Sequence, residues 1–188
     1  MMKQGRVYFI GVGPGDPELI TIKGKRIIEE ADIVIYAGSL INPDILKYSK
    51  KGASLYNSAS MNLKEIISII EIGAKNGSDI ARLHSGDPAI YGAIQEQIDE
   101  LNKKGIAFEI IPGVSSFLAS ASVLKNELTI PDIVQSVIIT RVNKRTSSPS
   151  GERLSEFARH GATLVIFLSI QLIEEVEREL LSVCPPDT

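Results

Sequence analysis

The tripeptide Gly-Asp-Pro occurs twice in this 188-residue chain, at residues 15–17 and 86–88. Each copy follows a short apolar run and precedes a segment with helical character, which predicts two loops at the ends of strands. An aspartate beside glycines offers carboxylate oxygens and accessible backbone, which suits a ligand that is positively charged or donates hydrogen bonds. Two copies in equivalent positions suggest a pair of loops that share a function.

The first loop, residues 11–17, departs from the fingerprint of dinucleotide-binding loops. Its glycines follow the pattern G-x-G-x-G, and Asp16 and Pro17 stand where the third glycine and the helix entry would be. A carboxylate repels a pyrophosphate, and proline lacks the N–H group that an anion site uses. The residues therefore favour S-adenosylmethionine, which carries a sulfonium, an ammonium and an adenine amine, over a polyphosphate.

An architectural interpretation of both loops stays open, because Asp followed by Pro is a common helix start. His84 could likewise bind a ligand or move protons, although a lone histidine at a strand end is more often structural. No cluster of metal-type ligands accompanies it, so we expect no metal. Tyr91 could line a pocket or pack, and the basic cluster around Arg141 could meet an anionic substrate or belong to a solvated loop.

Composition narrows the class of protein. The chain is 44% hydrophobic and 23% charged with a formal charge of −3, which is typical of a soluble globular protein and argues against a nucleic-acid partner. A lone cysteine, Cys184, excludes an intrachain disulfide framework and favours a reducing compartment, the cytoplasm. The apolar run at residues 7–12 is too short to enter a membrane, so no membrane partner is expected.

Strand-like and helical segments alternate along the first 111 residues, which predicts an α/β fold with a doubly wound parallel sheet. The expected strands are residues 7–11, 33–36, 53–56, 80–83 and 108–111. The expected helices are residues 22–31, 44–48, 62–75 and 89–104.

Pro112-Gly113 marks the expected boundary between an N-terminal lobe, 1–112, and a C-terminal lobe, 113–188. In the second lobe we expect strands at 137–140 and 164–168, with helices at 116–124, 152–159 and 171–183. The last residues, 184–188, have the composition of a connecting loop, which predicts that the second lobe is C-terminally truncated.

Several motifs, in this order, resemble one family. They are residues 12–17 (Val-Gly-Pro-Gly-Asp-Pro) followed by 19–21 (Leu-Ile-Thr), 31–32 (Ala-Asp) with 36–40 (Tyr-Ala-Gly-Ser-Leu), 82–92, 111–115, 128–131 (Leu-Thr-Ile-Pro) and 139–141. Together they are similar to the tetrapyrrole (corrin/porphyrin) methyltransferases. The motifs at 36–40 and 128–131 narrow the resemblance to the precorrin-4 or cobalt-precorrin-4 C(11)-methyltransferases of cobalamin synthesis.

The resemblance implies two α/β lobes, a homodimer, and S-adenosylmethionine bound in the cleft between the lobes. It also implies methyl transfer to ring carbon 11 of the tetrapyrrole. Beside the two loop carboxylates, Asp16 and Asp87, it assigns further residues to the cofactor: Pro14, Ser85, Gly86, Ile90, Tyr91, Ser115, Ser116 and Leu168.

The implied substrate carries many carboxylates, and basic residues near the predicted strand ends are candidates to bind them. They are Lys23, Arg82, Arg141 and Lys144. Related uroporphyrinogen methylases carry an acidic residue after the tyrosine of the second strand, whereas this chain has Ala37-Gly38-Ser39 there. No catalytic base is therefore assigned, and alignment of the methyl donor and acceptor can supply much of the acceleration.

Three alternatives remain at this point. The chain could methylate another ring position, such as C(17) or C(20), or it could belong to the related diphthine synthase branch. It could also be a regulatory module that binds a nucleotide through the same loops without any chemistry.

Overall fold

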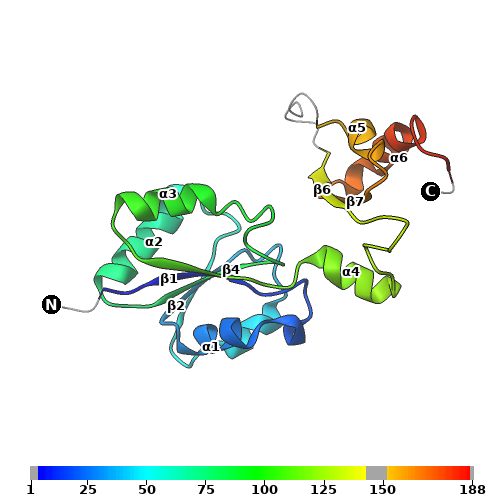
Figure 1. Ribbon diagram of the computed structural model, residues 1–188. Helices are drawn as coiled ribbons and strands as arrows, with labels where there is room; N and C mark the ends of the chain where they lie inside the picture. The colour runs from blue at the N-terminus through cyan, green and yellow to red at the C-terminus, as the bar shows by residue number, and fades with distance from the viewer. Residues whose placement is uncertain (1–3, 143–151, 187–188) are drawn as a thin grey trace. The chain divides into compact units, whose positions relative to one another are not determined.

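The computed structural model describes residues 4–142 and 152–186, which divide into two compact units, Met1–Ala119 and Ser120–Thr188 (Figure 1). Each unit has a sheet of its own. The division lies inside helix α4 (Ser116–Leu124), a few residues beyond the boundary expected after residue 112.

The first unit is built on five parallel strands in the order β3-β2-β4-β1-β5. Strand β4 lies between β1 and β2, and Gly11 at the end of β1 is level with His84 at the end of β4. The carboxyl ends of the strands therefore meet at one edge, and the expected α/β fold with a parallel sheet is confirmed. The strands are β1 (Val7–Gly11), β2 (Ile33–Tyr36), β3 (Ser54–Asn57), β4 (Ile80–His84) and β5 (Phe108–Ile111).

Helices cover both faces of this sheet. Helix α1 (Ile22–Glu30) lies on one face, and α2 (Leu63–Lys75) and α3 (Gln95–Lys103) lie on the other (Figure 1). Two of the helices have side-chain caps at their starts: the Thr21 hydroxyl accepts the Gly24 N–H at 3.1 Å, and Asn62 forms a capping box with Glu65. Two short 3₁₀ helices complete the unit, η1 (Pro17–Leu19) and η2 (Pro43–Tyr48).

Alternation along the strands divides the core into two clusters, one on each face. Val7, Phe9 and Ile80 point toward α2 and α3, whereas Ile10 and Leu83 point toward α1. All five side chains are completely buried. The sheet thus lies between two apolar layers, and the loops that follow its strands lie at its carboxyl edge.

The helix expected over residues 89–104 was predicted too long. Asp87 and Pro88 look like a helix start, but α3 begins only at Gln95 and residues 88–91 form a turn. Tyr91 and Ala93 have φ values of +52° and +49°, a left-handed conformation that ends any right-handed helix and costs a non-glycine residue about 1–2 kcal/mol. The β4 loop, defined as residues 85–94, is therefore irregular over its whole length.

The second unit contains a two-stranded parallel sheet of β6 (Val137–Arg141) and β7 (Thr163–Phe167). Both strands occur where they were expected. Helix α5 (Leu154–Ala158) is shorter than predicted, and a 3₁₀ turn, η3 (Ile170–Leu172), precedes α6 (Ile173–Leu181). Within the described ranges of both units, no helix is long and apolar enough to cross a membrane.

Candidate functional site

The two Gly-Asp-Pro loops lie against each other at the carboxyl edge of the first unit's sheet. Gly13 and Gly86 form an antiparallel bridge, in which the Gly86 N–H donates to the Gly13 carbonyl at 2.8 Å. The Val12 N–H donates to the carbonyl of His84 at 2.9 Å. The pairing of the loops that the repeated tripeptide suggested is therefore present in the structure.

The loop after β5 joins this pair through glycine. A Cβ atom built on Gly113 would lie 2.2 Å from the Gly86 carbonyl oxygen and 2.7 Å from the Gly11 backbone, a distance that real side chains do not reach. Only glycine at these crossing points lets the three loops approach so closely. Ser115 is buried beside this crossing, and Ser116 is exposed next to it.

Both loop aspartates hold the backbone. Asp16 accepts the Glu18 N–H at 2.9 Å and starts η1 with Pro17 at its first position, while Asp87 accepts the Ala89 N–H at 2.8 Å. The second carboxylate oxygen of Asp87 accepts the Gly113 N–H at 2.9 Å. The interpretation as a helix start is thus correct for Asp16, whereas Asp87 holds loop backbone without starting a helix. A contact of either residue with a cofactor stays a prediction.

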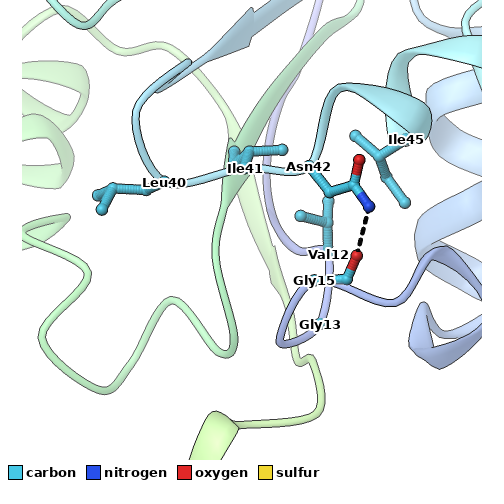
Figure 2. A pocket seen from close by; sticks show the side chains of 7 residues that line it. All are labelled: Val12, Gly13, Gly15, Leu40, Ile41, Asn42 and Ile45. Atoms are coloured by element: carbon cyan, nitrogen blue, oxygen red, sulfur yellow. Dashed lines mark hydrogen bonds between the residues drawn. The ribbon is translucent and has the colours of Figure 1, made fainter.

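Asn42 is a contributor that sequence reasoning missed. Its Nδ2 donates to the Gly15 carbonyl at 2.7 Å, and its Oδ1 accepts the Asp44 N–H at 3.0 Å, so it ties the chain after β2 to the first loop. Figure 2 shows this bond beside a cavity of about 10 Å³, room for about one water molecule. The cavity lies under the first loop and is lined by Val12, Gly13, Gly15, Leu40, Ile41, Asn42 and Ile45.

The structure brings together most, but not all, of the residues assigned to the cofactor. Pro14, Asp16, Ser85, Gly86, Asp87, Ser115 and Ser116 share the carboxyl edge of the first unit. Ile90 and Tyr91 follow in the turn of the β4 loop, where the Tyr91 side chain is 41% exposed. Leu168 belongs to the second unit, directly after β7, with φ of +56° and an exposed side chain.

The four basic residues assigned to the substrate lie in different settings. Lys23 forms an ion pair with Glu109 of β5. Arg82 is 7% exposed and lies on the α2/α3 face of the sheet, so its burial argues against contact with a large substrate. Arg141 ends β6 in the second unit with an exposed side chain, and Lys144 lies outside the described residues.

Arg82 belongs to a buried polar layer rather than to the surface. Its Nε donates to the Gln97 side chain at 3.3 Å and its Nη1 donates to the Ser58 hydroxyl at 2.9 Å. Burial lowers the pKa of Arg82 to about 10, which leaves the guanidinium protonated at neutral pH. The sequence signal for this role was an arginine within an otherwise apolar strand.

His84 is the second member of this layer, with 8% exposure, and it packs beside Phe9. Burial and then the charge of Arg82 lower its pKa from 6.5 to about 3, against the opposite effect of a hydrogen bond to the Gly92 backbone. Its Nε2 has no hydrogen-bond partner. Because this imidazole is neutral and enclosed, it is poorly placed to exchange protons with a substrate.

The pKa of His84 predicts a loss of stability in mild acid. The unfolded imidazole returns to a pKa near 6.5, so below that pH the unfolded chain binds a proton that the folded chain rejects until about pH 3. Stability is fully present above pH 6.5 and falls by about 1.4 kcal/mol per pH unit from this group. We expect about 2 kcal/mol less stability at pH 5 than at pH 7, measured by urea unfolding.

His84→Asn is expected to be less stable at pH 7 but to lose this part of the pH dependence. His160→Asn, at an exposed position in the second unit, is the control and should keep the slope of the unmodified chain. An equal slope in all three proteins would contradict the assignment to His84.

The described residues of this site form a binding surface and include few side chains that could take part in a reaction. No group of three or more His, Cys, Asp or Glu side chains in the ranges 4–142 and 152–186 is arranged to hold a metal ion. The three loops, residues 11–17, 85–92 and 112–116, contain two aspartates and no lysine or arginine. They can therefore enclose and orient a ligand, and their charge favours a cationic one over an anion.

A parallel α/β sheet with paired loops beyond its carboxyl edge is the architecture of proteins that bind a small cofactor at that edge. The model of the tetrapyrrole (corrin/porphyrin) methylases matches residues 6–188. The chain belongs to this family, which confirms the resemblance found in its motifs.

Individual relatives agree with this assignment. The chain is 56% identical over 176 residues to a cobalt-precorrin-4 C(11)-methyltransferase of Methanocaldococcus jannaschii, a match that covers 94% of this chain and 68% of the relative. It is 46% identical to a precorrin-4 C(11)-methyltransferase of Pseudomonas aeruginosa, with 93% and 70% covered.

Solved structures give the same result. A cobalt precorrin-4 methyltransferase of cobalamin biosynthesis matches with a TM-score of 0.92 and 43% identity, over 95% of this chain and 74% of that one. A uroporphyrin-III C-methyltransferase of Thermus thermophilus, complexed with S-adenosylhomocysteine, matches with a TM-score of 0.77 and 31% identity, over 96% and 73%.

Proposed function

We propose that this protein transfers a methyl group from S-adenosylmethionine to ring carbon 11 of precorrin-4 or cobalt-precorrin-4, in the synthesis of cobalamin. The observation that carries the proposal is the 56% identity to a cobalt-precorrin-4 C(11)-methyltransferase over 94% of the chain. The Tyr36 to Leu40 and Leu128 to Pro131 motifs, which narrowed the resemblance to this branch, support the same ring position.

The charge of the loops in the first unit supports this cofactor. These loops carry carboxylates and no basic side chain. S-adenosylmethionine supplies an electrophilic methyl group on its sulfonium. The residues proposed to hold it are Pro14, Asp16, Ser85, Gly86, Asp87, Ile90, Tyr91, Ser115, Ser116 and, from the second unit, Leu168.

The chain's own part in the reaction is positioning. The bond from sulfur to the methyl carbon breaks as a bond from that carbon to the ring forms, and S-adenosylhomocysteine is released. Holding the two reactants in line can contribute roughly 7–11 kcal/mol of the lowered barrier in favourable cases. The proposal therefore needs no acid or base from residues 37–39, where relatives of another branch have a carboxylate.

The substrate and the assembly are part of the same proposal. Arg141, with its exposed side chain at the end of β6, Lys144 and Lys23 are the candidates for substrate carboxylates, and Arg82 is the least suited because it is buried. We further propose a homodimer, a cytoplasmic location and two lobes, 1–112 and 113–188.

A tryptophan in place of Ser85 tests the cofactor site. Ser85 is exposed at the start of the β4 loop, so a large ring there should fill the proposed site without disturbing the core. We expect Ser85→Trp to weaken S-adenosylhomocysteine binding by at least about tenfold in calorimetry, or 1.4 kcal/mol. Ser68→Trp, on the exposed face of α2, is the matched control and should change affinity by less than twofold.

The same titrations with NAD and ATP distinguish the alternatives. Binding of NAD or ATP in place of S-adenosylhomocysteine would point to a nucleotide-binding module and contradict a methyltransferase. Incubation with precorrin-4 and S-adenosylmethionine, followed by mass and NMR analysis of the product, identifies the methylated carbon. A new methyl group at any carbon other than C(11) would refute the proposed ring position.

A further inference from the structure

The β4 loop contains strained backbone, which contacts with the surrounding residues must stabilise. Tyr91 and Ala93 are both non-glycine residues in the left-handed region, which persists only where surrounding structure enforces it. Gly92 between them cannot accept a side chain, because a Cβ atom would lie 2.1 Å from the Pro88 carbonyl oxygen. The same loop carries Ser85 to Tyr91, the residues proposed to contact the cofactor.

Gln97 of α3 reaches this strained segment from below. Its side chain is 5% exposed, and its Nε2 donates to the Ala93 carbonyl at 3.2 Å. Its Oε1 accepts from Arg82 Nε. Arginine has donors only, so the amide oxygen must face Arg82 and the amide nitrogen must face the loop. Arg82 therefore determines which way Gln97 points.

Arg82 is itself fixed by the end of a neighbouring strand. Its Nη1 donates to the Ser58 hydroxyl, and that hydroxyl donates to the Tyr36 carbonyl at 3.1 Å. The acceptors described for Arg82 are an amide, a hydroxyl and a backbone carbonyl, all of them neutral. Burying a cation among neutral partners costs desolvation free energy, so such a group adds little to the stability of a fold. This suggests that the role of Arg82 is to orient the side chain of Gln97.

His84 lies on the same face of β4 as Arg82 and is also buried. The contact that reaches the strained segment is the hydrogen bond from Gln97 to the Ala93 carbonyl. We propose that Gln97, oriented by Arg82, is a positioning residue that holds the β4 loop in the conformation that receives the cofactor.

This inference rests on the proposed function for the identity of the ligand, but its structural part can be tested alone. Gln97→Glu keeps the size of the side chain. The new carboxylate can still accept a hydrogen bond from Arg82, and it carries a negative charge where the amide was neutral. The variant loses the N–H group that donates to the Ala93 carbonyl. We expect the urea midpoint to be unchanged or higher, while amide hydrogen exchange in residues 90–94 becomes at least tenfold faster and S-adenosylhomocysteine affinity falls about tenfold.

Gln95→Glu is the control, since it makes the same change at an exposed position on the same helix and should leave loop exchange and affinity as they were. Unchanged exchange in Gln97→Glu would refute the support of the loop. Faster exchange with unaltered affinity would refute its relevance to the cofactor. If the unmodified chain bound no S-adenosylhomocysteine, the proposed function would fail, while the exchange data would still decide whether Gln97 holds the loop.

Discussion

Replacing Gly113 by alanine is expected to lower the free energy of unfolding by about 3 kcal/mol or more, at the upper end of what overpacking costs. The new methyl group would meet the Gly86 carbonyl oxygen at 2.2 Å and the Gly11 backbone at 2.7 Å. These are main-chain atoms of two other loops, so no side-chain rotation can relieve the contact. Urea unfolding followed by circular dichroism measures the loss.

The clash can be separated from the general effect of adding a methyl group. Gly105→Ala places the same group where no atom lies within 4 Å, at φ of +63°, and should cost only about 1–2 kcal/mol for the left-handed backbone. Equal losses in the two variants would show that the three loops can move apart. The site would then be more deformable than its hydrogen bonds indicate.

The second large effect is expected in the core between the sheet and α2. Ile70 is completely buried there, and Ile70→Ala should cost about 2–5 kcal/mol through lost burial and the cavity left behind. Ile72 lies two residues further along the same helix and is 59% exposed. Ile72→Ala should change stability by no more than about 0.5 kcal/mol.

This pair is closely matched, because both variants exchange the same residue types within one helix and any gain in helix propensity cancels. The difference between the two unfolding free energies therefore reports burial alone. A difference below about 1 kcal/mol would contradict the position assigned to α2 on the sheet, since full burial of an isoleucine stabilises by more than that.

Local patterns were sufficient to predict the sheet, because each strand is a short apolar run and each crossover helix has a periodic face. Even the edge strand β3 was found within one residue. The two copies of Gly-Asp-Pro were harder to interpret, since they behave differently. Asp16 starts a helical turn, whereas Asp87 shares its carboxylate between Ala89 and the distant Gly113, and no helix follows.

The remaining parts of the site depend on contacts between segments far apart in sequence. Arg82 follows the residue pattern of a strand end, but the register of β4 turns it toward α3 and away from the surface. Asn42 reads as a helix cap, and only the fold shows that its amide also reaches Gly15. No local signal in the sequence distinguishes these partners from others of the same type.

The strand order has a consequence for the growing polypeptide. Within the described residues, strand β1 pairs with β4 and β5 alone, so its apolar residues Val7 to Ile10 have no hydrogen-bonded neighbour until the ribosome has made β4. Strands β2 and β3 can pair much earlier. During this interval β1 is an unpaired strand that can pair with another polypeptide and aggregate. Slow translation before β4 would therefore prolong exposure to aggregation and increase the need for a chaperone.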